Sequence, residues 1–326
     1  MSSSIWPVLL AAVLLSGCGS LHNSQPQKNT HFCGPNAPAL IQPAQVPATA
    51  AQYIACASNI DLEMYELGNP VLIGDLIAAH KRGASVKVLL DATERQSAFS
   101  GKQLAAAGIP MRYVHVPGGI DHIKLLVVDG GSAVLTGGIN WGSDSTYTRD
   151  LDVLLPGDPS AAAVFSADWK AGSSGKPNEP TSSGAITGTF ILSRMEDAIH
   201  VAPAGSTVEI AANYLTDWSV QNALAAAAKR GVRVETVLNR SAYGAASAAE
   251  WLTAHGVQVR WAPNSPYLHA KILLTPAGGM IGSANFSNDG LKPVNRELDV
   301  ILPASLLPGA HTWFASLWRG SAPFQG

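Results

Sequence analysis

The chain has 326 residues, of which 47% are hydrophobic and 13% charged, and its formal net charge is −2. This composition permits a large buried core and excludes an intrinsically disordered chain. The near-neutral charge, without a basic run, gives no general footprint for nonspecific nucleic-acid binding. Phosphate-loop, His-Glu-x-x-His and Cys-x-x-Cys motifs are absent from the sequence, so neither a cofactor nor a metal is expected.

The N-terminus has the pattern of an export signal. Residues 1–17 carry no charged side chain, and the apolar run over residues 5–15 is too short to span a bilayer. The sequence Leu15-Ser16-Gly17-Cys18 resembles a bacterial lipoprotein processing site, which would make Cys18 the lipidated N-terminus. The alternative is an ordinary secretory signal. Both interpretations predict export, and the first predicts a lipid-anchored protein of the bacterial periplasm or cell envelope.

Residues 18–48 are rich in Ser, Asn, Gln, Pro and Ala without helical or strand periodicity, which is typical of a flexible tether. Cys33 and Cys56 are the only cysteines besides Cys18. Export permits a disulfide between them, because oxidising compartments preserve such bonds. The sequence leaves open whether their Cβ atoms approach closely enough.

Residues 49–170 alternate helical stretches with apolar runs, which predicts a first lobe. The expected helices cover residues 48–58, 70–82, 101–107 and 160–171, and the expected strands cover residues 60–67, 86–91, 110–115, 122–128, 133–136 and 150–155. This order indicates an α/β fold in which a mixed sheet has helices on both faces. A linker over residues 171–188 leads to a second lobe over residues 189–322, where the order repeats.

One polar motif occurs once in each lobe. Its first copy is His122-Ile-Lys124, four apolar residues, Asp129, then Gly137-Gly138-Ile-Asn140. Its second copy is His269-Ala-Lys271 followed by Gly282-Ser283-Ala-Asn285. A histidine and a lysine two residues apart lie on the same face of a strand. Each copy therefore groups an imidazole, an ammonium and a carboxamide, which together suit a phosphate.

The repetition extends beyond this motif. Arg149-Asp150-Leu-Asp152 returns as Arg296-Glu297-Leu-Asp299, and equivalent positions are offset by 147 residues (269 − 122 and 297 − 150) or 145 (285 − 140). Such a period indicates a duplicated half-domain rather than a solenoid. Two lobes related by a pseudo-twofold axis would bring the two motif histidines face to face within one monomer.

These residues resemble the signature of the phospholipase D superfamily, which is His-x-Lys-x4-Asp followed by Gly-Gly/Ser-x-Asn, in two copies. The resemblance covers about residues 49–320. It implies two similar α/β/α sandwich lobes with the active site at their interface, and a supporting role for Asp129. The second copy departs from the signature, because Pro276 stands where the aspartate belongs. A degenerate second half is therefore one alternative.

The chemistry follows from the negative charge of a phosphodiester. Four side chains would stabilise its non-bridging oxygens without a metal ion: Lys124, Lys271, Asn140 and Asn285. One imidazole would attack phosphorus to form a phosphohistidine, while the other protonates the departing alcohol and later activates water or an acceptor alcohol. We expect His122 to be the nucleophile, because the first motif is complete and the family usually uses its first histidine, and His269 to be the acid/base.

Two acids are expected to orient these histidines. Asp150 and Glu297 each stand 28 residues after a motif histidine (150 − 122 and 297 − 269). A carboxylate on one ring nitrogen fixes the tautomer and frees the other nitrogen to react, as the corresponding position does in the family. Gly138 and Ser283 are expected to offer backbone donors to the substrate. Two further acids are expected to be solvated strand ends: Asp152 and Asp299.

Three functions remain open. The first is a lipid-active enzyme, a phospholipase D or cardiolipin-synthase-like transferase that hydrolyses or transphosphatidylates phospholipids, which the predicted membrane tether favours. The second is a metal-independent endonuclease of the same superfamily, acting on nucleic acid through a local basic groove. The third is an inactive binding lipoprotein, against which the presence of both motifs with their acidic partners argues.

Overall fold

The computed structural model of the protein describes residues 33–172 and 184–325. The predicted signal peptide, the predicted lipidation at Cys18 and the middle of the predicted linker lie outside these ranges. Among the described residues, no helix is both long enough and apolar enough to cross a membrane.

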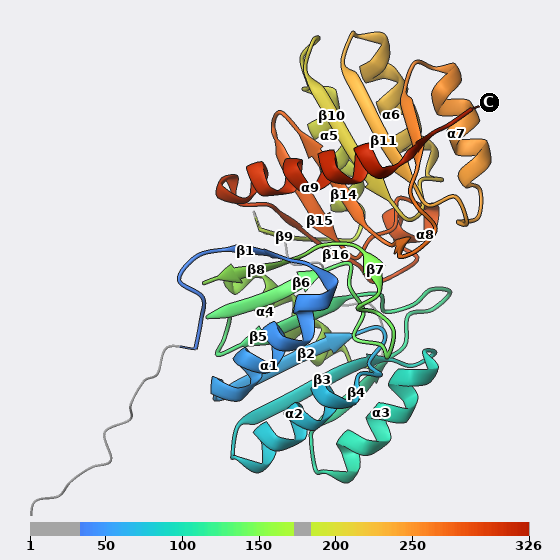
Figure 1. Cartoon of the computed structure of the whole chain (residues 1–326). Coiled ribbons are helices and arrows are strands. Elements are labelled where there is room, and N and C mark those ends of the chain that lie inside the picture. The colour runs from blue at the N-terminus through green and yellow to red at the C-terminus, as the bar shows by residue number, and fades with distance from the viewer. Residues whose placement is uncertain (1–32, 173–183, 326) are drawn as a thin grey trace, which may run out of the picture. The chain divides into compact units, whose positions relative to one another are not determined.

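The first lobe is built on a seven-stranded mixed sheet (Figure 1). Its described elements are, in chain order, β1 (Ala39–Ile41), α1 (Val46–Cys56), β2 (Asn59–Met64), α2 (Pro70–Lys81), β3 (Ser85–Asp91), α3 (Arg95–Ala106), β4 (Met111–Val114), β5 (Lys124–Val128), β6 (Ala133–Gly137), β7 (Thr148–Arg149), β8 (Asp152–Pro156) and α4 (Pro159–Ala171). Strands β2, β3 and β4 are parallel, whereas β5, β6, β8 and β1 continue the sheet in antiparallel pairs.

The second lobe repeats this arrangement on an eight-stranded sheet. Its described elements are β9 (Ala185–Thr187), α5 (Thr189–His200), β10 (Thr207–Ala212), α6 (Trp218–Lys229), β11 (Arg233–Leu238), α7 (Ala245–Ala254), β12 (Gln258–Trp261), β13 (Tyr267–Leu268), β14 (Lys271–Thr275), β15 (Gly278–Gly282), α8 (Asn288–Leu291), β16 (Leu298–Ile301), α9 (Leu307–Gly320) and β17 (Ala322–Pro323).

Strand order confirms the predicted α/β fold with two similar lobes. The first sheet runs β1-β8-β6-β5-β2-β3-β4, and the second runs β9-β16-β15-β14-β10-β11-β12 with β17 added at its end. Seven strands thus take the same order twice. Strands β7 and β13 belong to neither of these sheets; they pair with each other in parallel.

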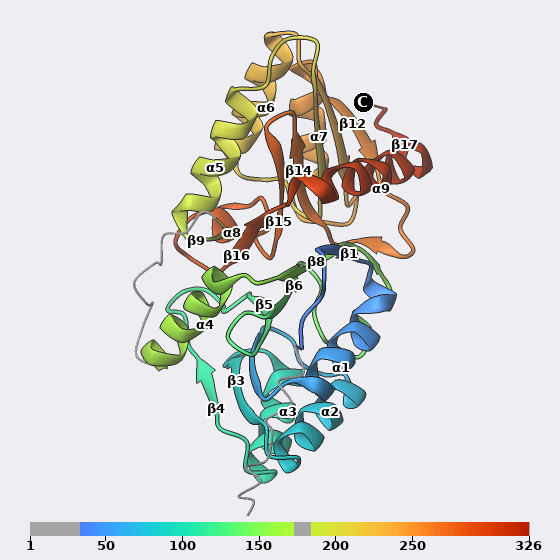
Figure 2. The same cartoon turned by 90° about the vertical axis from the view of Figure 1, so that its left-hand side faces the viewer.

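Each sheet is buried on both faces. On its outer face, the first sheet packs with α1, α2 and α3, and the second packs with α5, α6 and α7, as Figures 1 and 2 show. The inner faces contribute residues of both lobes to one shared core, which also includes apolar residues of α4 and α9. Burying apolar side chains in this shared core stabilises the interface on which the predicted site depends.

Two predicted boundaries are wrong because short edge strands belong to the fold. The tether was expected to reach residue 48, but β1 pairs with β8 and α1 begins at Val46. The linker was expected to reach residue 188, but β9 pairs with β16 in the equivalent place. A three-residue strand is too short to show periodicity, so its backbone pairing is visible only in the folded sheet.

Helix α3 starts at Arg95, six residues before the expected position. Its first turns contain serines, which suggest a loop in the sequence but make hydrogen bonds inside the fold. The Glu94 side chain caps the helix by accepting a hydrogen bond from the Ser97 backbone N–H at 2.7 Å. The buried Ser97 hydroxyl donates to the Tyr65 carbonyl at 2.6 Å and accepts from the Leu67 N–H at 3.0 Å. These contacts hold the segment that follows β2.

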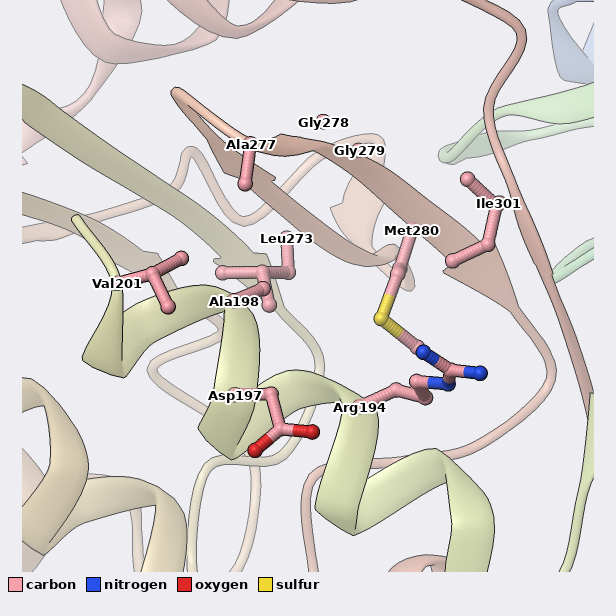
Figure 3. Close-up of a pocket in the computed structure, with 10 residues that line it drawn as sticks. All are labelled: Arg194, Asp197, Ala198, Val201, Leu273, Ala277, Gly278, Gly279, Met280 and Ile301. Atoms are coloured by element: carbon pink, nitrogen blue, oxygen red, sulfur yellow. The ribbon is translucent and has the colours of Figure 1, made fainter.

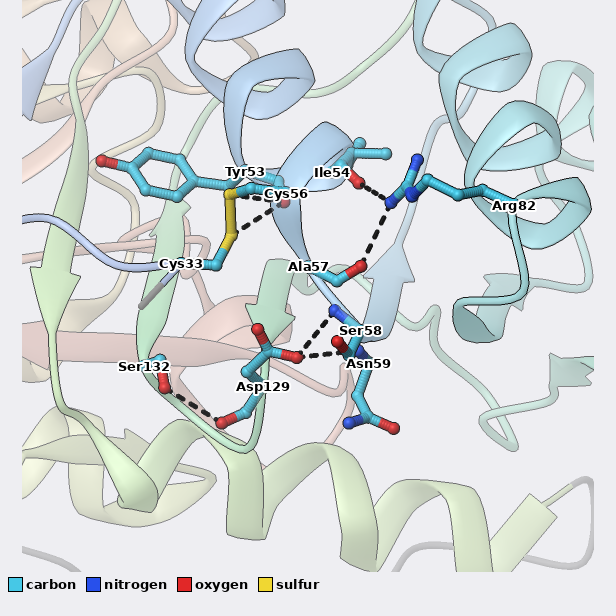
Figure 4. The surroundings of a disulfide bond; sticks show 10 residues. All are labelled: Cys33, Tyr53, Ile54, Cys56, Ala57, Ser58, Asn59, Arg82, Asp129 and Ser132. Carbon is cyan, nitrogen blue, oxygen red and sulfur yellow. Dashed lines mark hydrogen bonds between the residues drawn. A yellow bond between two sulfur atoms is a disulfide. The ribbon is translucent and has the colours of Figure 1, made fainter. Parts of the chain in front are cut away.

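A disulfide joins Cys33 to Cys56 at the end of α1, with Cα atoms 5.6 Å apart (Figure 4). It attaches the segment before β1 to the first lobe. Asp129 lies in the same region, and its carboxylate accepts hydrogen bonds from the Ser58 and Asn59 backbone N–H groups at 2.9 and 2.8 Å. Asp129 therefore joins the end of β5 to the start of β2.

A cavity of about 240 Å³ lies in the second lobe between α5 and the β14–β15 hairpin (Figure 3). Its walls are mostly apolar and include Leu273 and Met280, with Arg194 and Asp197 from α5 along one side. None of the motif histidines, lysines or asparagines lines it. This cavity is therefore separate from the predicted site.

Candidate functional site

The two motifs lie at corresponding ends of central strands, one in each sheet. Lys124 is the first residue of β5 and pairs with Met64, the last residue of β2. Lys271 is likewise the first residue of β14 and pairs with Ala212, the last residue of β10. The motifs therefore stand where the parallel strands of each lobe end, which is where open α/β sheets usually bind ligands.

The backbone of each motif crosses to the other lobe. The His122 N–H donates to the Arg296 carbonyl at 2.8 Å, and the His269 N–H donates to the Arg149 carbonyl at 3.0 Å. The residue after each arginine is one of the predicted acidic partners. Exchanged backbone pairing thus brings each histidine beside the acid of the opposite lobe.

The histidine–carboxylate pairs are consequently crossed. His122 Nδ1 lies 3.0 Å from both carboxylate oxygens of Glu297, and His269 Nδ1 lies 3.0 Å from Asp150 Oδ2. The 28-residue spacing associates each acid with the histidine of its own lobe, and this association is wrong. The predicted role is compatible with the geometry, because each carboxylate engages Nδ1 and not Nε2. The Nε2 atom of His269 lies 3.1 Å from Lys271 Nζ.

Ser283 was expected to offer a backbone donor to the substrate, and the structure shows instead that it contacts Glu297 and Leu298. Its hydroxyl donates to Glu297 Oε2 at 2.5 Å, and its backbone N–H donates to the Leu298 carbonyl, so neither group is directed at substrate. At the equivalent position, a Cβ on Gly138 would lie 2.5 Å from Asp150 Oδ2. Glycine makes room for one carboxylate, whereas serine positions the other.

Asp152 and Asp299 are buried rather than solvated, which overturns the expectation for them. Their carboxylates accept hydrogen bonds from the backbone N–H groups of Ile139 and Ala284, at 3.0 and 3.1 Å. Burial raises the pKa of Asp299 to about 8 and the pKa of Asp152 well above its usual range. These acids fix the Gly-rich turns that lead to the motif asparagines.

The two motif lysines are almost completely buried. Burial lowers the pKa of Lys124 to about 7, against an opposing effect of Glu297, and lowers the pKa of Lys271 to about 8, against an opposing effect of Asp150. Each ammonium donates to the carbonyl of its own motif histidine. A bound phosphate would supply the missing counter-charge, so both lysines are suited to bind an anion.

Electrostatic coupling of the histidines also crosses the interface. Burial lowers the pKa of His122 well below its usual range, and Lys124 and then Lys271 lower it further. Burial lowers the pKa of His269 to about 4, with Lys271 and Lys124 acting in the same direction. Each histidine therefore responds to the lysines of both lobes, as expected for two motifs that form one site.

The motif asparagines differ in their neighbours. Asn140 Nδ2 donates to Glu66 Oε2 at 3.0 Å, whereas the Oδ1 atoms of Asn140 and Asn285 are buried without a partner among the described residues. Sequence reasoning missed Glu66, because the equivalent position after β10 is Tyr214 and no repeat marks it. It also missed Tyr65, whose ring meets that of His122 edge-on at 5.0 Å.

Pro276 lies away from this site. It follows β14 at the exposed tip of the β14–β15 hairpin, at the opposite end of the strand from Lys271. Its counterpart Asp129 has a supporting role at the corresponding end of β5. The second motif thus loses a structural contact and keeps its histidine, lysine and asparagine.

Within the described ranges, no cluster of three or more His, Cys, Asp or Glu side chains is arranged to hold a metal.

The fold and site define a class: duplicated α/β proteins with paired histidine, lysine and carboxylate groups at the lobe interface. The model of the family described as "Cardiolipin synthase, PLD-like domain" matches residues 51–169 and again residues 198–318. The chain therefore belongs to the phospholipase D superfamily of phosphodiesterases.

Individual relatives are distant. The chain is 33% identical over 115 residues to the mitochondrial cardiolipin hydrolase of Xenopus tropicalis, covering 34% of this chain and 53% of that protein. It is 27% identical over 129 residues to a phospholipase D of Rickettsia conorii, covering 38% of this chain and 64% of that protein. The matched segments thus span about half to two thirds of these relatives.

The solved structure of polyphosphate kinase from Porphyromonas gingivalis is similar in fold over both lobes. It matches 84% of this chain and 46% of its own chain with a TM-score of 0.66 and 15% sequence identity. At this identity the likeness shows a shared fold alone.

Proposed function

We propose that the protein is a phospholipase D that cleaves or exchanges the head group of a phospholipid through a phosphohistidine. The observation that carries this proposal is the crossed pair of histidine–carboxylate contacts beside two buried lysines. Two oriented imidazoles provide a nucleophile and an acid/base, and the lysines provide charge stabilisation for the phosphoryl group.

In the first step, His122 Nε2 attacks phosphorus while the bond from phosphorus to the head-group oxygen breaks. His269 must be protonated before this step, which the negative charge of the bound phosphodiester favours by offsetting the two lysines that lower the pKa of this ring. It then transfers a proton to that oxygen, and the head group leaves as an alcohol. Glu297 stabilises the positive charge that develops on the His122 ring. Lys124 and Lys271 interact with the non-bridging oxygens as their charge increases.

In the second step, His269 takes a proton from water or from an acceptor alcohol, which attacks phosphorus and breaks its bond to His122. With water the product is phosphatidic acid, and with an alcohol it is a new phospholipid. Asp150 stabilises the His269 imidazolium in its protonated state.

A lipid substrate is favoured over nucleic acid by the net charge of −2 and by the predicted lipid anchor at Cys18, which would hold the site beside a membrane. The names of the relatives, a cardiolipin hydrolase and a phospholipase D, are consistent with this choice. We further propose that the protein is exported to the cell envelope and acts as a monomer, since both halves of the site belong to one chain.

The test uses the purified full-length chain with a chelator present. Vesicles of phosphatidylglycerol or phosphatidylethanolamine and single-stranded DNA are offered in parallel, with His122→Ala and His269→Ala as controls. We expect phosphatidic acid and free head group from the wild type alone. Cleavage of DNA without lipid turnover would favour an endonuclease, and loss of activity on chelation would contradict a metal-free mechanism. No activity in any arm would favour an inactive binding protein.

A further inference from the structure

A carboxylate stands inside a site that is built for an anion. Glu66 follows β2 and hydrogen-bonds through Oε2 to the carboxamide of Asn140, one of the groups expected to contact the phosphate. A negative charge at this position opposes phosphate binding unless it interacts with another part of the substrate. The second lobe carries the phenol of Tyr214 at the matching position, so the fold itself does not require an acid there.

The position of Glu66 is fixed from both sides. Its carbonyl accepts a hydrogen bond from the Trp141 N–H at 2.9 Å. The preceding and following residues are held by the buried Ser97, through the Tyr65 carbonyl and the Leu67 N–H. Glu66 is therefore a pre-positioned group and not a mobile surface acid.

The side chain of Glu66 is fixed as well. Gln96 donates through Nε2 to Glu66 Oε1, and the Ser143 N–H donates to Gln96 Oε1 at 3.2 Å, which sets the orientation of the glutamine amide. Glycine is needed close by, since a Cβ on Gly142 would lie 2.3 Å from Glu66 Oε1. A carboxylate accepts about four hydrogen bonds, and two are used, so the half-buried oxygens can accept donors from a ligand.

The electrostatic surroundings favour a positively charged ligand group. Lys124 is a nearby cation, but Glu94 and Asp144 add negative charge close to Glu66. The carboxylate also lies within electrostatic reach of Tyr65 and Tyr267, and it contributes to raising the pKa of both phenols after burial. These rings meet His122 and His269 edge-on, at 5.0 and 5.9 Å between ring centroids. Lys124 Nζ already lies over the Tyr65 ring, 5.1 Å from its centroid, so the Tyr267 ring is the one suited to a ligand cation.

We propose that Glu66, with the ring of Tyr267, is the specificity-determining group that receives a cationic amino-alcohol head group such as ethanolamine. Acidic and aromatic groups together bind ammonium ions, the former through charged hydrogen bonds and the latter through their faces. The head group leaves from phosphorus beside the two histidines, which is where these groups stand. This inference rests on the proposed phospholipase D function.

The experiment compares head-group release from phosphatidylethanolamine and from phosphatidylglycerol in vesicles of one carrier lipid. The full-length wild type is measured beside Glu66→Gln, which keeps the shape of the side chain and removes its charge. We expect the ratio of kcat/KM for phosphatidylethanolamine to that for phosphatidylglycerol to fall about tenfold, because a hydrogen bond to a charged group of one head group is lost. Free ethanolamine should inhibit the wild type and inhibit the variant more weakly.

The matched control is Asp144→Asn, which removes a neighbouring charge without changing a contact to Asn140. It should change the ratio of the two substrates less than Glu66→Gln does. An equal loss on both lipids in Glu66→Gln would overturn the proposal and leave Glu66 as a positioning residue for Asn140. An unchanged ratio would also overturn it. A wild type that releases neither head group would remove the proposed function and this inference together.

Discussion

The crossed pairing predicts which histidine responds when one carboxylate is neutralised. Glu297→Gln preserves the size of the side chain, but the Nδ1 of His122 loses its charged partner at 3.0 Å. A hydrogen bond to a charged group contributes about 1.5–3 kcal/mol. Since a factor of ten corresponds to about 1.36 kcal/mol, kcat for head-group release should fall about 10- to 150-fold.

The assay that separates the two pairs is NMR of ring nitrogens in protein labelled with ¹⁵N-histidine, recorded alongside the kinetics. Glu297→Gln should mainly shift the ring resonances of His122, whereas Asp150→Asn should mainly shift those of His269. Resonances are assigned with His122→Ala and His269→Ala. The reverse pattern, in which each acid affects the histidine of its own lobe, would refute the crossed geometry.

Three further predictions concern pH, the disulfide and the altered motif. Burial lowers the pKa of Lys124 and raises the pKa of Glu297, each to about 7, so kcat/KM should pass through a maximum near that pH, because Glu297 loses its charge below it and Lys124 loses its charge above it; a pH–rate profile measures this, and a flat profile from pH 5 to 9 would contradict it. Replacing Cys33 and Cys56 with serine opens a loop with a sequence separation of 23 and should lower the free energy of unfolding in urea by about 3 kcal/mol, whereas an unchanged urea midpoint would exclude a stabilising disulfide. Pro276→Asp should leave kcat within about twofold in the head-group assay, because this hairpin tip lies away from the reactive groups, and a large gain would indicate that the second motif is impaired.

The duplicated motif made the architecture predictable. A repeat of about 147 residues requires two similar units, and the apolar runs between the motif residues required buried strands. The repeat and the apolar runs each occur in both halves of the sequence, and the structure correspondingly contains the same seven-strand order twice. The short strands β1 and β9 could not be predicted, because their formation depends on pairing with β8 and β16 and not on their own sequence.

The crossing of the acids could not be derived from spacing. In a duplicated chain, the interval from His122 to Asp150 equals that from His269 to Glu297 whether the partners belong to one lobe or to both. Only the backbone exchange across the interface, from His122 to Arg296 and from His269 to Arg149, selects the second arrangement. Glu66 escaped prediction for the opposite reason, since it lacks a repeated counterpart and a single glutamate carries little information.

The two histidines need different protonation states, although duplication gives them similar motifs. The difference must therefore come from residues that do not repeat. Asp121, which precedes His122, and Glu63 are fully buried, and burial together with the nearby Asp168 raises the pKa of both carboxyl groups well above their usual range.

Arg296 adds a buried ion pair with Asp168, at 3.1 Å, to the same side of the interface. The positions in the second lobe that match Glu63 and Asp121 are Ala211 and Leu268, so the second lobe has no counterpart to these two buried acids. Arg296 also provides the carbonyl that receives the His122 N–H, which couples this charged cluster to the orientation of one histidine only. Asp91 at the end of β3 acts to raise the pKa of His122, and the matching position after β11 is the uncharged Asn239, so a side chain that differs between the lobes acts on one of the two imidazoles.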